Sequence, residues 1–327
     1  MPFLLLNLPL DLRNRVISHM HPADLFSLYL TSTKMGRIVK SLKIRAENFE
    51  WSFCMVRHAL SGDHPQVELK FADDRIFILA LSMDTDWPFK WTTIDGMKVF
   101  VSGPFHRTKK AAWFMLPLHP DLFSMNVSLL ETATRPLLDC FDPKAFSVRS
   151  RGLNISMTPF FLKYTKTFKK FSATSLGLLA RREPFGETQM KLLLHDIDVE
   201  ELEVEGVVDV LNFNGVLNHR RLSTIGGWLT LDNVLNMQCS VLEVAESNFP
   251  ASDLNKIIKT WCEGGKRLAR LEKMEISCEK RFETDTLFAG IETKRDSEEH
   301  GVWIRRADGK VASVTTNGKQ LRLVVSK

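Results

Sequence analysis

The chain has 327 residues, of which 44% are hydrophobic and 25% charged, and its formal net charge is +5. This balance is typical of a soluble protein; it allows acidic partners and does not demand a nucleic acid. The longest apolar runs span only a few residues, so the sequence predicts no transmembrane helix. Residues 1–10 are apolar but have no basic leader and no small-residue cleavage site, so we do not interpret them as a signal peptide.

The cysteines are odd in number, widely scattered and without a C-x-x-C pair; they are Cys54, Cys140, Cys239, Cys262 and Cys278. This pattern favours buried thiols in a reducing compartment over a disulfide framework or a zinc site. We therefore expect a cytoplasmic or nuclear protein, or one found in both places.

Residues 8–42 predict three short helices. Pro9 suits the first turn of a helix, and Leu12, Val16 and Met20 then fall four apart on one face. The pair His21-Pro22 ends that helix and begins a second one, because proline disfavours the helical conformation in the residue before it. The second helix carries the stripe Leu25, Leu28 and Tyr29. Ser32 can cap a third, whose stripe is Met35, Ile38, Val39 and Leu42.

This N-terminal unit has more apolar surface than it can bury. Units below roughly 40 residues usually need a partner to complete a core. The three helices either pack on the rest of the chain or dock on another protein. The third helix can also continue through Ile44 and Ala46 toward Trp51.

The order of these residues resembles the F-box consensus: Leu8-Pro9, then Val16, Met20 and Pro22, and later Leu25, Leu28, Ser32 and Lys34. Asp11 stands where the consensus usually has glutamate, and Gly36 where it commonly has tryptophan. The resemblance implies a three-helix F-box that binds a Skp-type adaptor and, through it, a cullin-RING ubiquitin ligase. It also implies a set of adaptor-binding residues, namely Leu8, Pro9, Leu12, Val16, Met20, Leu25 and Leu28.

The next part of the chain, residues 50–130, is mixed and leans toward strands. Val67, Leu69 and Phe71 alternate with charged residues, and Asp95-Gly96 signals a turn. A further strand is expected at residues 125–129. Residues 129–141 predict a helix, although Pro136 should break or kink it.

Residues 160–171 combine aromatic and basic side chains. Phe161, Tyr164, Phe168 and Phe171 share one helical face, and lysines spread over the other. Such a mixture could bind RNA through stacking and phosphate contacts. An amphipathic helix that covers a sheet explains it too. Aromatic stripes at helical spacing are usually core, so we favour packing and expect no nucleic-acid partner.

The second half contains a weak internal repeat of short strands. Its four copies are Val199-x-x-Leu202-x-Val204, Leu222-x-x-Ile225-x-Gly227, Cys239-x-x-Leu242-x-Val244 and Leu271-x-x-Met274-x-Ile276. The steps from Val204 to Ile225 and on to Val244 are 21 and 19 residues, which matches the period of leucine-rich repeats; the step to Ile276 is 32. The pattern predicts a curved parallel sheet in residues 195–280 that buries Leu202, Val204, Leu242, Val244, Met274 and Ile276.

The segments beside these strands predict a helix and a hairpin pair. Ser252 can cap a helix with the stripe Leu254, Ile257, Ile258 and Trp261, stopped at Gly264-Gly265. Asn248-Phe249 resembles the asparagine turn of leucine-rich repeats. Near the end, Asp308-Gly309 and Asn317-Gly318 lie between apolar runs and predict a three-stranded antiparallel meander that caps the repeat stack.

Residues 191–249, together with residues 253–261, also resemble the second type of F-box-associated domain, known from the large nematode F-box family. The pieces that match are residues 199–206, Ser247-Asn248-Phe249 and residues 253–261. The resemblance implies that this half recruits the protein to be ubiquitinated. The expected fold is therefore α+β or α/β: an F-box at 1–45, a mixed region at 46–185 and a leucine-rich-repeat-like domain with the meander at 186–327.

Catalytic motifs are missing from the sequence. Gly226-Gly227 and Gly264-Gly265 lack the Lys-Ser/Thr of a phosphate loop, and no G-x-S-x-G elbow occurs. His19 and His21 are the one histidine pair at close spacing, and they lie where a helix ends. We expect a non-catalytic substrate receptor without cofactor or metal. A hydrolase or transferase of unfamiliar type, and a scaffold that uses the F-box outside a ligase, are the alternatives.

Overall fold

The computed structural model describes residues 7–54, 66–82, 90–94, 97–105, 111–117, 123–153, 157–175, 177–178, 181–182, 184–206, 208, 213, 215–295 and 301–326. The chain forms two compact units, Met1–Arg149 and Ser150–Lys327. The three-part division expected at residues 45 and 185 stays a prediction. The turn expected at Asp95-Gly96 lies outside the described residues.

The first unit begins with the three expected helices, α1 (Leu10–Ser18), α2 (Pro22–Thr31) and α3 (Thr33–Ser41). Local chemistry fixes where two of them start. The backbone N–H of Ala23 donates to His21 Nδ1 at 3.2 Å, and that of Met35 donates to Ser32 Oγ at 3.2 Å. Both side chains replace a backbone acceptor that the first turn of a helix lacks.

The expected continuation of the third helix is wrong. Lys43 has a positive φ of 44°, which ends the helical path, and the chain continues as β1 (Ile44–Ala46) and β2 (Asn48–Cys54). Cys54 is the last residue of β2.

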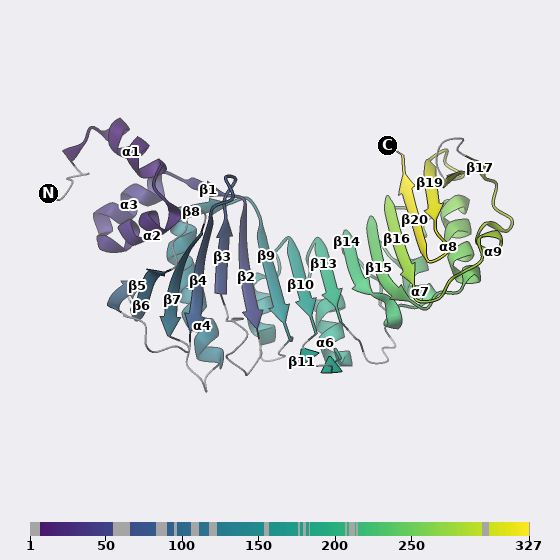
Figure 1. Ribbon diagram of the computed structural model, residues 1–327, viewed down its shortest axis with the longest axis horizontal. Coiled ribbons are helices and arrows are strands. Elements are labelled where there is room, and N and C mark those ends of the chain that lie inside the picture. Colours follow the sequence, from purple (N-terminus) through teal and green to yellow (C-terminus); the bar gives the residue numbers. More distant parts are fainter. Residues whose placement is uncertain are drawn as a thin grey trace. The chain divides into compact units, whose positions relative to one another are not determined.

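The main sheet of this unit confirms the β-leaning middle region (Figure 1). Its strands run in the order β2-β3-β4-β7-β6-β5, and β4 and β7 are the parallel pair among them. Their bounds are β3 (Gln66–Lys70), β4 (Ile76–Ser82), β5 (Lys90–Ile94), β6 (Met97–Phe105) and β7 (Ala111–Pro117); β8 (Phe141–Pro143) pairs with β1, and β9 (Phe146–Arg151) crosses the unit boundary.

Helix α4 (Phe123–Cys140) contains most of the helix expected at residues 129–141 and also covers residues 125–129, where a strand was expected. Residues 125–129 are helical and not a strand, because a short apolar run fits either element and α4 is continuous through it. Pro136 lies inside the helix. Trp51 Nε1 donates to Thr134 Oγ1 at 3.0 Å in the buried layer between α4 and β2.

The second unit is organised around parallel strands (Figure 1). Strands β10 (Lys170–Thr174), β13 (Glu201–Glu205), β14 (Arg221–Ile225), β15 (Val241–Ser247) and β16 (Lys273–Cys278) pair in that order, all parallel. Every residue predicted to lie in the sheet core is buried: Leu202, Val204, Leu242, Val244, Met274 and Ile276.

The register corrects the second copy of the repeat. Leu222 lies opposite both Leu202 and Leu242, so it is Leu222 and not Ile225 that takes the first buried position. The aromatic stripe is also corrected. Helix α5 (Thr158–Tyr164) ends early and Phe171 lies on β10, yet Phe161, Phe168 and Phe171 are all buried, which confirms the packing interpretation.

Besides α5, the helices of this unit follow its strands. They are α6 (Glu187–Lys191) with the π-helical turn η3 (Leu192–Asp196), the 3-10 turn η4 (Gly226–Trp228), α7 (Leu231–Asn236), α8 (Ala251–Glu263) and α9 (Thr284–Phe288). Helix α8 buries its predicted stripe, but Pro250 and not Ser252 is its N-cap. It ends at Gly264, whose φ of +73° favours glycine. Asn248 is exposed, so it forms no buried asparagine turn.

The C-terminal meander is confirmed. Strands β18 (Gly301–Arg305), β19 (Val311–Thr316) and β20 (Gln320–Val325) pair antiparallel, with positive φ at Gly309 and Gly318 in the two turns. Strand β20 pairs with β16, so the meander covers the edge of the parallel strands. The remaining strands are the hairpin β11 (Gly177–Leu178) with β12 (Arg181–Arg182), and β17 (Lys294–Arg295), which pairs with β18.

Candidate functional site

Helix α1 exposes apolar side chains. Leu10, Leu12 and Val16 are 58%, 52% and 41% exposed, and Ile17 is the one residue of this helix that is buried. The helix has only nine residues. Isolated helices shorter than about 12–15 residues are marginal in water, so most of their stability must come from packing. The apolar side chains exposed on so short a helix are therefore the candidate docking surface of this unit.

The residues predicted to bind the adaptor fall into two groups. Pro9, Leu12 and Val16 are exposed, and Leu8, Met20 and Leu28 are half-buried. Leu25 is buried in the core of the first unit, where it supports the helices from within. Leu10 is the most exposed of the large apolar side chains in the described residues, and the four-residue spacing of the stripe did not indicate it.

The neighbouring helices are fixed to the body of their unit, which leaves the exposed side of α1 as the open surface. Phe26 of α2 packs edge-on against Phe77 of β4, with ring centroids 5.3 Å apart. Tyr29 Oη donates to Asp139 Oδ2 at 3.1 Å. Lys40 Nζ of α3 lies 2.6 Å from the other oxygen of Asp139. Helices α2 and α3, which follow α1 in the chain, are therefore held in place before any partner binds.

The second unit offers an open sheet face, formed by the side chains that alternate with the buried core. Its middle row, read across the paired strands, is Ser172, Glu203, Ser223, Glu243, Glu275 and Arg322. Glu243 lies at the centre and accepts from Arg221 Nη2 at 2.6 Å and from Lys273 Nζ at 2.7 Å. Burial alone would raise the pKa of Glu243, but the hydrogen bonds from these two cations hold it below its usual range.

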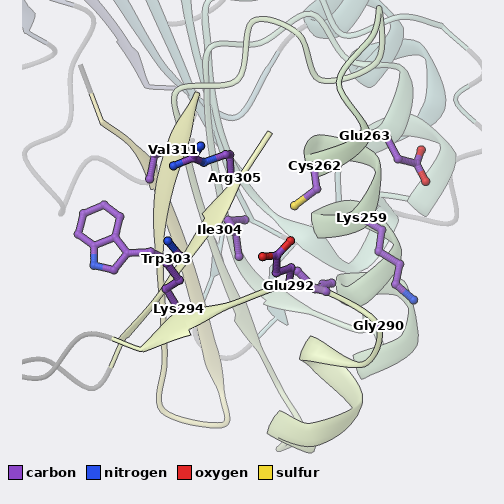
Figure 2. A pocket seen from close by; sticks show the side chains of 11 residues that line it. Lys259, Cys262, Glu263, Gly290, Glu292, Lys294, Trp303, Ile304, Arg305 and Val311 are labelled. Atoms are coloured by element: carbon purple, nitrogen blue, oxygen red, sulfur yellow. The ribbon is translucent and has the colours of Figure 1, made fainter. Parts of the chain in front are cut away.

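A cavity of about 550 Å³ lies between α8 and β18 and gathers ionisable groups (Figure 2). Cys262 and Glu292 both line this cavity, and in the close-up the side chains of Lys259 and Glu263 extend to the opposite side of α8 from the Cys262 thiol. Burial, with a smaller effect from Glu263, raises the pKa of the Cys262 thiol, so this thiol is not an activated nucleophile. The residues that line the cavity include no histidine that could serve as its base.

Metal-binding clusters and membrane-spanning helices are both absent from the described ranges. No three His, Cys, Asp or Glu side chains there converge so as to hold a metal ion. None of the helices there combines the length and the apolar character needed to cross a membrane.

Comparison with known families identifies both regions. Residues 5–47, which include α1–α3, match the F-box domain. This chain is an F-box protein. Residues 211–276 match the F-box associated family of the second type, which places β14, α7, β15, α8 and β16 as far as Ile276 in the F-box-associated domain of this F-box protein. The match begins at residue 211, later than the resemblance quoted for residues 191–249, and its last residue is Ile276 on β16.

The two families set a coarse expectation for chemistry. F-box domains typically bind Skp-type adaptors, and both families are generally non-catalytic. Neither the curated proteins nor the solved structures with which the chain was compared gave a match.

Proposed function

We infer that this F-box protein is the substrate-recognition subunit of a Skp-cullin-F-box ubiquitin ligase. The observation that carries the inference is the exposed apolar side of α1, formed by Leu12 and Val16 with Pro9 before them, inside the matched F-box. This surface suits a Skp-type adaptor, because large apolar side chains held on a fixed support bind without a large loss of conformational entropy.

The adaptor-binding set divides by burial. Leu12, Val16 and Pro9 are the direct anchors, with Leu8, Met20 and Leu28 at their margin. Leu25 acts indirectly, by holding α2 against the core of its own unit. Adaptor binding then joins the chain to a cullin-RING ligase.

The second unit is the region that recruits the target. Its strands repeat at Leu202, Leu222 and Leu242, and Met274 continues the same buried row after an insertion. This arrangement supports a short leucine-rich-repeat-like solenoid, within a domain that we place at residues 186–327, after an F-box at 1–45 and a mixed region at 46–185. Repeat stacks present extended surfaces to their partners, and the open sheet face around Glu243 is such a surface.

Catalysis in this scheme is by proximity. The receptor raises the effective concentration of a target lysine beside a charged conjugating enzyme, and it needs no nucleophile of its own. We place this role in the reducing cytoplasm or nucleus, where free thiols persist. Two of the buried thiols are also unsuited to act as nucleophiles. Burial raises the pKa of Cys239 to about 12, and it raises that of Cys140 even further.

Reconstitution tests the proposal. The full-length chain, a purified Skp-type adaptor and a cullin-RING pair are mixed and separated by size-exclusion chromatography. We expect all four proteins to elute together, and the chain to be lost from that peak when the adaptor is omitted. Binding to the adaptor without incorporation into the cullin complex would support the scaffold alternative and contradict the ligase role.

A further inference from the structure

A second cavity, of about 600 Å³, opens where β15 and β16 end. The crevice beyond the carboxyl ends of parallel strands is where open sheets commonly bind ligands. Phe249 and Phe282 supply apolar wall, and Ser247 and Cys278 form a buried floor. The size is sufficient for one large side chain of a peptide together with its neighbours.

The floor of this cavity carries no charge. Ser247 Oγ and Cys278 Sγ lie 3.2 Å apart, and the thiol also lies 3.8 Å from the backbone carbonyl of Phe249. Burial raises the pKa of Cys278, and the hydrogen bond with Ser247 offsets this only in part. The thiol is therefore protonated at neutral pH and does not repel an anion.

Two adjacent cations, Lys280 and Arg281, line the cavity and are exposed. Neither has an ion pair or a side-chain hydrogen bond within the described part of the chain, unlike Arg221 and Lys273 on the open sheet face. The acid in the lining is Glu283, whose carboxylate accepts a hydrogen bond from the Thr286 hydroxyl at 3.4 Å. The lining thus has one positive charge in excess, and its cations are available to a ligand.

The segment that carries these cations is held at both ends. The backbone N–H of Cys278 donates to the carbonyl of Lys319 at 2.7 Å, and that of Phe282 donates to the carbonyl of Gly318 at 2.8 Å. Both acceptors lie in the turn between β19 and β20. Because the backbone of this segment is already ordered, less conformational entropy is lost when a ligand binds the two side chains.

We propose that this cavity binds an oxyanion-bearing side chain, a phosphate or a carboxylate, on a peptide segment of the target. Arginine and lysine bind such groups by charge-assisted hydrogen bonds, and the arginine fork does so with two parallel contacts. Phe249 and Phe282 contact the apolar part of the same segment. The inference rests on the proposed role as a target receptor and narrows the target class to acidic or phosphorylated peptides.

Titration of the full-length chain with two small probes tests the proposal. The probes are acetyl-phosphoserine-amide and acetyl-glutamate-amide, followed by ligand-observed NMR. The variant is Lys280→Gln with Arg281→Gln. Its matched control is Lys266→Gln with Arg267→Gln, which removes the same two residue types, in the same order, from an exposed loop outside the cavity.

We expect saturable binding of at least the phosphoserine probe and a loss of affinity of roughly tenfold or more in the cavity variant, because that variant removes the charge-assisted hydrogen bonds to the oxyanion. The control should bind like the parent. Binding of phosphoserine alone identifies a modified target, and comparable binding of both probes identifies an acidic one. No saturable binding by the parent, or equal losses in the variant and the control, would overturn the proposal.

The adaptor titration keeps the two proposals separate. The cavity variant should bind a Skp-type adaptor like the parent. A parent that binds phosphoserine but no adaptor leaves the anion site standing and removes the ligase role. If the parent binds the adaptor but neither probe, the ligase role stands and the anion site is ruled out.

Discussion

His219 Nδ1 lies 3.0 Å from the backbone carbonyl oxygen of Val199, one repeat earlier in the chain. Since a carbonyl can only accept, Nδ1 carries the proton and Nε2 is the unprotonated nitrogen. That nitrogen is buried without a hydrogen-bond partner in the described residues. His219 occupies the position three residues before the first buried strand residue, which Val199, Cys239 and Leu271 hold in the other repeats.

This placement predicts a pH-dependent stability. Burial lowers the pKa of His219 below its ordinary 6.5, and the hydrogen bond to Val199 offsets the effect only in part. Below pH 6.5 the unfolded chain therefore binds a proton that the folded chain resists. The free energy of unfolding should fall as the pH drops from 6.5 to the lower folded-state pKa, and it should be insensitive to this group above pH 6.5.

The variant His219→Leu isolates this contribution, because leucine holds the same position at Leu271. We expect the Tm of the parent to fall more steeply than that of the variant between pH 7.5 and pH 5.5. Thermal melts at several pH values measure it. Parallel pH profiles for the two proteins would show that His219 is not buried as described.

The same histidine explains why the sequence could place most of the repeat but not all of it. The apolar spacing in the first, third and fourth copies leads directly to their buried residues. The second copy has His219 and Thr224 where the others have apolar residues, so the best apolar match shifted to Ile225. The hydrogen bond to Val199 that makes a histidine acceptable there depends on the paired strands and cannot be seen in the pattern.

In the F-box helices, too, some features follow from the local sequence and others depend on distant parts of the chain. Pro22 and Ser32 act on neighbouring backbone, so their helix starts follow from local sequence. Helix α2, which carries Leu25, packs on β4 and α4, and both lie far along the chain. The apolar spacing of the helices alone could therefore not show that Leu25 is buried while Leu12 is exposed. The cavity beside β15 and β16 was also beyond prediction, since its lining comes from residues 247–251 and 278–286.

The packing of α2 on its unit can be tested through Phe26. Its side chain is fully buried against Phe77, so Phe26→Ala should reduce the free energy of unfolding of that unit by about 3–5 kcal/mol. Chemical denaturation followed by tryptophan fluorescence measures the loss. Leu138→Ala, on the surface of α4, is the control and should change stability by about 0.5 kcal/mol or less. Similar curves for parent and Phe26→Ala would mean that the F-box helices do not pack on this sheet.

The core of the parallel strands can be tested through Leu242. This side chain is fully buried, so Leu242→Ala should cost about 2–5 kcal/mol of stability. Its control is Val216→Ala, which truncates an exposed residue of the same unit. Urea unfolding curves compare the two. An unchanged midpoint for Leu242→Ala would count against the repeat register described for β13 to β16.

Docking of the exposed side of α1 on an adaptor can be measured by isothermal titration calorimetry with a purified Skp-type adaptor. The variant is Leu12→Ala with Val16→Ala. Its control is Leu162→Ala with Val216→Ala, which removes the same side-chain types from comparably exposed positions in the second unit. Each anchor of an interface typically contributes more than about 1 kcal/mol, and a central one about 2 or more, so the pair should be worth roughly a hundredfold in Kd.

Parent and control should bind the adaptor equally, the α1 variant should bind roughly a hundredfold more weakly, and all three should have the same circular dichroism spectrum. Equal affinity for the α1 variant and the parent, or no binding by the parent at all, would contradict adaptor docking through α1.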